Sequence, residues 1–181
     1  MTPAYTPAER RARETFLALL RALSFPGLLQ PLPARGLEEA LQAIGEALLD
    51  EGVGLYAPGP LLQRLRPTGV RPRPWREADY LLLPRLEGEH LAWLGELRRG
   101  SLLEPERSAT LVVGARLGQG LSLVLEGPGV EGSRQVRLGG LPPAFFAERA
   151  RLMEYPLGFE VFLTDGQRVL GLPRTVRAEV L

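Results

Sequence analysis

The first part of the chain repeats apolar residues at the spacing of an amphipathic helix. Thr6 stands at the N-cap position, Pro7 at the first helical position, and Glu9 where it completes a capping box. We expect this helix to end at Pro26-Gly27, because proline and glycine terminate helices. Its predicted apolar face consists of Phe16, Leu19, Leu20 and Leu23.

Three later segments also have helical character. Residues 37–49 fit a second helix, whose apolar face is Leu37, Leu41, Ile44 and Leu48. Residues 88–99 fit another amphipathic helix, and Pro142-Pro143 opens one that continues to about residue 154. Pro58-Gly59-Pro60 is expected to end a short strand at residues 53–56, and the proline-interrupted stretch 66–76 is not expected to form regular helix.

Short apolar runs bounded by Gly and Pro predict strands, which are mostly in the second half of the chain. These runs are residues 53–56, 78–83, 109–117, 121–126, 134–138, 159–164, 168–172 and 176–181. Asp165-Gly166 lies between two of them and is a two-residue hairpin signal. Helices dominate the first half and antiparallel strands the second, without an internal repeat or linker. The sequence therefore predicts one α/β domain over residues 1–181, with a mixed sheet.

Composition narrows the possible partners. The chain has 181 residues, with 22 basic and 21 acidic side chains, so whole-molecule attraction for nucleic acid or an anionic membrane is not expected. Its apolar stretches are too interrupted to span a bilayer. The first residues lack the apolar core of a signal peptide. We therefore expect a cytoplasmic protein that uses neither nucleic acid nor membrane.

Missing residue types exclude several chemistries. The chain has no Cys, no Lys and no Asn, and its single histidine is His90. Without Cys there is no disulfide, thiolate nucleophile or iron–sulfur site, and without Lys there is no Schiff base to pyridoxal phosphate. The amine of Met1, the remaining primary amine, is not expected in a pocket. We expect no metal and no cofactor. The lack of Asn and Cys suits heat tolerance, and GC-rich coding explains it equally well.

Two segments, residues 52–57 and 127–132, have the G-x-G-x-x-[G/A] spacing of dinucleotide-binding loops. Neither leads from a strand into a helix, as phosphate binding requires, so both are predicted to be turns. The second is expected to join antiparallel strands. His90 is predicted to be a surface or half-buried residue. A convergence of Glu126, Glu154 and Glu160 as paired acids stays open.

Arginines supply the candidate binding groups. Five of them lie within residues 61–76, a window without acids: Arg64, Arg66, Arg71, Arg73 and Arg76. They fit either an anion site or a solvated loop that coding bias made basic. Arg174 is the better candidate, since it follows Pro173 and lies between two predicted strands, at the rim of a sheet. The alternative is that Arg174 pairs with a local carboxylate such as Glu160 and braces the fold.

Five segments in order resemble one protein family. They are F-L-A-L-L-R-A-L-S-F-P-G at 16–27, A-T-L at 109–111, E-G-P-G at 126–129, Y-P-L-G-F-E at 155–160 and L-P-R-T at 172–175. Together they resemble the PhnH family, the H subunit of the carbon–phosphorus lyase core complex and of alpha-D-ribose 1-methylphosphonate 5-triphosphate synthase. Glu160 stands where the family pattern has Asp, and Leu23 where it often has Met.

The resemblance implies a reduced form of the pyridoxal-phosphate-dependent transferase fold that lacks the cofactor lysine. It also implies a role in phosphonate catabolism with the G, I and J subunits, in a reaction where an alkylphosphonate displaces adenine from ATP. The product is a ribose 1-phosphonate 5-triphosphate. Because the nucleosidase chemistry is placed on the I subunit, this chain would be an accessory subunit, and a homodimer when isolated.

The candidate ligand- or partner-binding residues are Ser24, Glu160, Arg174 and Thr175, and no catalytic residue is assigned. The ligand class would be a nucleotide or a phosphonate. Two alternatives stay open. In one, the chain is an autonomous enzyme in which Arg174 grips phosphate and Glu160 acts as acid/base. In the other, it is an oligomerising scaffold without a ligand. Turn chemistry alone explains the motif residues Gly127, Gly129, Gly158 and Pro173.

Overall fold

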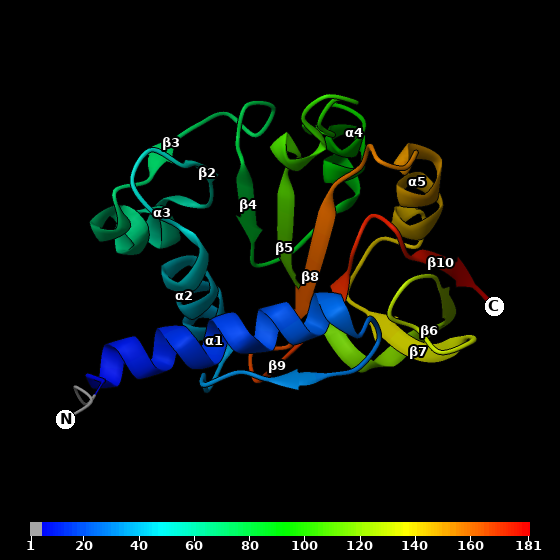
Figure 1. Cartoon of the computed structure of the whole chain (residues 1–181), viewed down its shortest axis with the longest axis horizontal. Helices are drawn as coiled ribbons and strands as arrows, with labels where there is room; N and C mark the ends of the chain where they lie inside the picture. Colours follow the sequence, from blue (N-terminus) through cyan, green and yellow to red (C-terminus); the bar gives the residue numbers. More distant parts are fainter. Residues whose placement is uncertain (1–4) are drawn as a thin grey trace.

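A seven-stranded mixed sheet runs through the middle of the molecule (Figure 1). The computed structural model describes residues 5–181, so Met1 and its amine lie outside the described residues. In spatial order the strands are β1 (Gln30–Pro31), β9 (Arg168–Leu172), β8 (Glu160–Thr164), β5 (Thr110–Gly114), β4 (Tyr80–Leu83), β2 (Gly54–Tyr56) and β3 (Arg71–Pro72). Neighbours from β8 to β3 are parallel, whereas β9 and β1 are antiparallel to theirs. The prediction of a single α/β domain with a mixed sheet is confirmed.

The expectation that antiparallel strands dominate the second half is wrong for the centre of the sheet. There β5 pairs in parallel with both β4 and β8. A parallel pair needs a long crossover, and the chain between β5 and β8 contains two of the three strands of a second sheet and a helix. The antiparallel β8–β9 hairpin is present as predicted. Its turn is held by Asp165, whose Oδ1 accepts hydrogen bonds from the backbone N–H of Gln167 (3.1 Å) and Arg168 (2.8 Å).

The second sheet is small and antiparallel. It has the order β10 (Arg177–Val180), β6 (Arg116–Glu126) and β7 (Arg134–Gly139). The glycine-rich segment 127–132 joins β6 to β7 as a turn, as predicted. The predicted strand 109–117 is divided in the structure. It ends at Gly114 in the large sheet and restarts at Arg116 in the small one, because the chain leaves one sheet for the other at Ala115.

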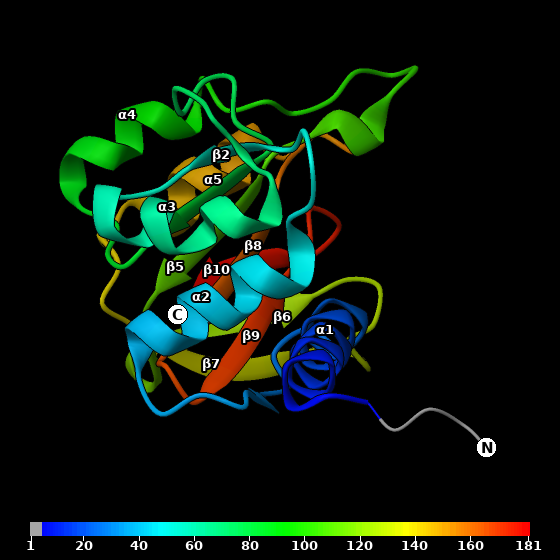
Figure 2. The same cartoon turned by 90° about the vertical axis from the view of Figure 1, so that its left-hand side faces the viewer.

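Alternate residues of the central strands supply two separate cores. Leu82, Val112 and Phe162 pack on one face with the helices α1 (Pro7–Ser24), α2 (Leu37–Leu48) and α3 (Gly59–Leu65). Leu81, Leu111 and Val161 pack on the other face with α5 (Phe145–Leu152), the one-turn α4 (Leu91–Leu94) and the small sheet. Figure 2 shows α1 and α2 on their side of the sheet, and a segment between α4 and β5 that projects from the body.

Helix α1 has the predicted N-cap, and of its predicted apolar face Leu19 and Leu23 pack in the core but Phe16 and Leu20 do not. The Thr6 hydroxyl accepts from the Glu9 N–H, and the Glu9 carboxylate accepts from the Thr6 N–H, which completes the capping box. The buried residues are Thr15, Ala18, Leu19 and Ala22, whereas the expected Phe16 and Leu20 are 48% and 52% exposed. Close packing selects the small residues. A Cβ at Gly171 of β9 would lie 2.5 Å from the Ala22 carbonyl oxygen, so helix and strand touch through backbone.

The other helical predictions hold in part. Helix α2 matches the predicted segment 37–49. The predicted break at 58–60 does end the strand, and it coincides with the start of α3, since proline is well suited to the first turn of a helix. Residues 88–99 form only a 3-10 turn and the short α4, and α5 is shorter than its predicted range. Further 3-10 turns are Arg66–Thr68 and Pro105–Arg107. Among residues 5–181, no helix is long and apolar enough to cross a bilayer.

Candidate binding groove

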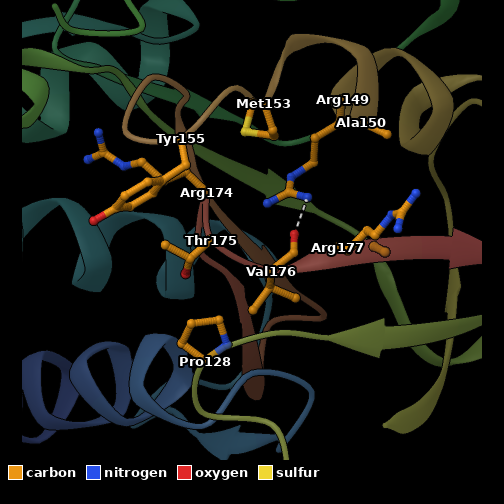
Figure 3. Close-up of a pocket in the computed structure, with 10 residues that line it drawn as sticks. Pro128, Arg149, Ala150, Met153, Tyr155, Arg174, Thr175, Val176 and Arg177 are labelled. Atoms are coloured by element: carbon orange, nitrogen blue, oxygen red, sulfur yellow. Dashed lines mark hydrogen bonds between the residues drawn. The ribbon is translucent and has the colours of Figure 1, made fainter. Parts of the chain in front are cut away.

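A groove of about 600 Å³ lies where α5 meets the β9–β10 and β6–β7 turns (Figure 3). Of the residues that the structure describes, its lining contains three arginines and no carboxylate. The lining residues are Pro128, Arg149, Ala150, Met153, Tyr155, Arg174, Thr175, Val176, Arg177 and Ala178. A cavity of this size is within the range of ligand and partner pockets. We call this feature the arginine groove.

Arg174 is held on several sides by its own chain. Its Nε donates to Oε1 of Glu160 at 2.6 Å, and its backbone N–H donates to Oε2 at 2.8 Å. Its Nη1 donates to the carbonyl oxygens of Pro105 (2.6 Å) and Pro156 (3.1 Å). The two charged side chains are 16% and 19% exposed, so water weakens their attraction less than at the surface. This geometry matches the alternative in which Arg174 pairs with Glu160 and braces the turn.

Arg149 is a buried cation in the wall of the groove. It is 2% exposed and comes from α5, and its two Nη atoms donate to the carbonyl oxygens of Leu172 (3.2 Å), Pro173 (2.7 Å) and Val176 (2.9 Å). Its Nε is buried without a partner among the described residues. Burial lowers the pKa of Arg149 to about 10, while the charge of Glu160 opposes this shift. Arg149 is therefore still charged at neutral pH, and it fixes the backbone that carries Arg174 and Thr175.

Glycines bring the separate motif segments into contact. A Cβ at Gly127 would lie 2.7 Å from the Thr175 carbonyl oxygen, and one at Gly129 would collide with the Ser24 carbonyl oxygen. A Cβ at Gly158 would lie 3.0 Å from Cβ of Arg174. Both Gly129 (φ +84°) and Gly158 (φ +154°) also have positive φ angles. Four of the five segments that carry the family resemblance thus meet around one surface, although they span residues 16–175.

The structure joins three of the four candidate residues. Glu160, Arg174 and Thr175 lie together, and Thr175 is exposed on the groove wall. Both Glu160 oxygens accept hydrogen bonds from Arg174, and Glu160 is not part of the lining. Ser24 lies exposed at the end of α1, outside the lining, and touches the Gly129 turn through its backbone carbonyl.

The remaining candidates lie away from the groove. In the basic stretch, Arg64 pairs with Glu38 at 3.0 Å, and Arg76 pairs with Glu96 and covers the Trp75 ring. The other arginines of this stretch are exposed. His90 is half-buried as predicted. Its Nδ1 accepts from the Glu87 N–H at 2.8 Å, and its ring packs edge-on against Trp93. Glu126 and Glu154 are exposed and, like Glu160, are not part of the groove lining.

The sequence reasoning missed Arg149, Tyr155 and Arg177 as groove residues. The sequence did contain a signal for Arg149. The buried face of α5 consists of Phe145, Phe146, Arg149 and Leu152, so the helical spacing places a charged residue at a core position. Arg177 gave no signal, since an exposed arginine at the start of a strand is unremarkable in sequence. Its place in the groove depends on where β10 joins the small sheet.

The arrangement is suited to binding. The described lining contains neither imidazole nor carboxylate, the groups that most often act as general bases. Within residues 5–181, no three His, Asp or Glu side chains form a group that would hold a metal ion. Arginine forks recognise carboxylate and phosphate groups, and the apolar wall of Met153, Val176 and Ala178 offers contact area beside them.

Comparison with known proteins agrees with the ordered motifs. The family model described as bacterial phosphonate metabolism protein (PhnH) matches residues 3–179. HtxG of Stutzerimonas stutzeri, named as a C-P lyase subunit, is 34% identical, with 91% of this chain and 84% of HtxG covered. The PhnH subunit of alpha-D-ribose 1-methylphosphonate 5-triphosphate synthase from Rhizobium meliloti (strain 1021) is 28% identical over 93% of this chain and 90% of its own length. The chain belongs to the PhnH family of bacterial phosphonate metabolism proteins.

Proposed function

We propose that this chain is an accessory subunit of a phosphonate-degrading carbon–phosphorus lyase system. In that role it supports a transferase reaction in which an alkylphosphonate displaces adenine from ATP and gives a ribose 1-phosphonate 5-triphosphate. The relatives HtxG and PhnH, which are both named as subunits, support this proposal. So does the family match over residues 3–179.

The arginine groove is the observation that carries the accessory role. Three motif segments contribute to its lining, yet Arg149 and Arg174 are bound to the chain's own carbonyls and, for Arg174, to Glu160. A side chain whose donors are already engaged braces a surface more readily than it stabilises a reacting group. The geometry therefore favours a subunit that presents a shaped surface, with the bond-making groups on another subunit.

The partners in this proposal are subunits of the G, I and J types. We further propose that the isolated chain is a homodimer. Phe16 and Leu20 on the outer face of α1 are half exposed, and apolar residues grouped on one helix face favour association. The proposal places the protein in the cytoplasm, with a fold that is a reduced form of the pyridoxal-phosphate-dependent transferases. The absence of lysine from the whole chain fits a version of that fold without the cofactor.

Reconstitution tests the proposed function. The chain is co-expressed with the G-, I- and J-type subunits of its own source, and adenine release from ATP and methylphosphonate is measured. We expect the chain to co-purify with these subunits, to release no adenine alone, and to be required for adenine release by the assembled set. Adenine release by the chain alone would establish the autonomous enzyme instead. Full activity of the other subunits without the chain would refute the accessory role.

A further inference from the structure

The open side of the arginine groove carries positive charge that is only weakly compensated. Arg177 is 72% exposed and its ion-pair partner, Glu179, is 63% exposed, with Nε and Oε1 2.9 Å apart. Exposed ion pairs of this kind contribute little to the stability of a fold, so Arg177 can leave Glu179 and bind another anion at little cost. Arg149 and Arg174 add two charges from the floor, against the single carboxylate of Glu160. An acidic group that enters here meets a surplus of cations.

The remaining donors of the groove lie on different sides of it. Nε and Nη1 of Arg174 and both Nη atoms of Arg149 already donate to the chain. This leaves Nη2 of Arg174, the exposed fork of Arg177 and the Thr175 hydroxyl for a visitor. Figure 3 shows the Arg174 and Arg177 side chains pointing to opposite sides, so carboxylates spaced along one segment match these donors better than one compact anion. A triphosphate requires several bidentate forks at one place, which are not free here.

The surroundings of the free donors suit an extended polypeptide. β10 is an edge strand that pairs only with β6 among the described strands, and its residues Arg177 and Ala178 line the groove. Edge strands leave backbone N–H and C=O groups available to an added strand. Tyr155 is 77% exposed at the rim, beside Arg174 (Figure 3). Exposed Tyr together with Arg is typical of the residues that dominate protein interfaces.

We propose that the arginine groove docks an extended acidic segment of another subunit of the complex. Asp or Glu carboxylates spaced along that segment pair with Arg177 on one side of the groove and with Arg174 and Thr175 on the other, and an adjacent apolar side chain packs on Tyr155 and Met153. This inference rests on the proposed function and adds the surface through which the chain joins its partners, together with the chemistry of the partner.

Charge reversal in the co-expressed complex tests the surface. Arg177→Glu is compared with Arg137→Glu, which reverses an exposed arginine on β7, at the opposite edge of the same small sheet. We expect Arg177→Glu to weaken assembly at least tenfold, and Arg137→Glu to leave it unchanged, with both variants melting as the wild type does. Arg177→Gln and Tyr155→Ala provide milder second variants if charge reversal disturbs folding, and both should weaken assembly. Equal assembly by Arg177→Glu and Arg137→Glu overturns the inference.

A photo-crosslinking amino acid at the exposed position Thr175 identifies what enters the groove. The expected adduct joins Thr175's position to an Asp- or Glu-containing segment of another subunit. An adduct to a second copy of this chain, or ATP or methylphosphonate binding by the isolated chain that Arg177→Glu abolishes, overturns the inference. Wild-type co-purification reports on the proposed function alone, so its failure is distinguishable from a failure of the Arg177 variants.

Discussion

At the scale of single residues, the Arg174 guanidinium makes three hydrogen bonds that lysine cannot reproduce together. The Arg174→Lys variant keeps the charge but loses the fork shared by Glu160, Pro105 and Pro156. Because the structure shows the bracing geometry, we expect a loss of about 1.5–3 kcal/mol in unfolding free energy, and weaker complex assembly that follows this loss. Urea denaturation and co-purification measure the two quantities.

The stability control for Arg174→Lys is Arg177→Lys, since Arg177 is exposed and pairs only with exposed Glu179 in the described chain. It should unfold as the wild type does. If Arg174→Lys retained normal stability and lost assembly, its guanidinium would contact a ligand or partner directly. If both stability and assembly were normal, Arg174 would be an ordinary surface residue.

Gly129 allows two distant segments to lie in contact because it has no side chain. Its φ of +84° already disfavours a side chain, and a Cβ would collide with the Ser24 carbonyl oxygen and lie 2.8 Å from Cδ of Pro26. Gly118 has nearly the same φ, +82°, but open space at its Cβ position. We expect Gly118→Ala to cost about 1 kcal/mol from backbone strain, and Gly129→Ala to cost clearly more. Equal losses in chemical denaturation would show that the contact with Ser24 is unimportant.

At the scale of elements, the β8–β9 hairpin carries a pH-sensitive turn. Burial raises the pKa of Asp165, but hydrogen bonds from the Arg168 side chain and from the Gln167 and Arg168 backbone outweigh it, and the net pKa is lowered. A carboxyl with a lowered folded-state pKa stabilises the fold above its unfolded pKa of about 3.9, and this contribution is lost as the pH falls through the folded value. Asp165→Asn should therefore be less stable than the wild type at pH 7.

The stability difference between wild type and Asp165→Asn should shrink below about pH 4. Thermal melts from pH 7 to pH 2 measure it. Gln167→Ala changes the same turn without a titratable group, so any change in its melting temperature should be similar at every pH. A constant difference between wild type and Asp165→Asn across this range would contradict the role of the charged carboxylate.

At the scale of the whole molecule, the outer face of α1 is expected to drive self-association. Phe16 and Leu20 are one helical turn apart and half exposed, and a net charge of +1 gives little repulsion between copies. We expect a dimer at micromolar concentration by light scattering. Leu20→Glu should give a monomer that melts normally.

Leu103→Glu is the matched control for Leu20→Glu. Leu103 is 93% exposed in the projecting segment between α4 and β5, so its substitution changes net charge equally and leaves α1 intact. It should remain dimeric. A monomeric wild type would refute self-association, and a dimeric Leu20→Glu would place the interface elsewhere.

Much of the local structure was predictable because its causes are local. The capping box at Thr6 and the hairpin at Asp165 depend on hydrogen bonds between residues two or three positions apart. The turn at residues 127–132 depends on glycine conformations. The lack of lysine likewise excludes a Schiff base in any fold. These conclusions required no knowledge of tertiary contacts.

Only the tertiary structure decided the rest, since it depends on residues that are far apart in the chain. The parallel pairing of β5 with β8 joins positions 50 residues apart, such as Thr110 and Glu160. Helix α1 buries the small residues Ala18 and Ala22 because it packs closely on Gly171. The larger Phe16 and Leu20, which the hydrophobic pattern favoured, are half exposed. Arg149 became a groove residue because the carbonyls of the β9–β10 turn compensate its burial. Hydrophobic periodicity along the chain does not predict these three features, because each depends on a contact with a distant segment. The periodicity does not show where that segment lies.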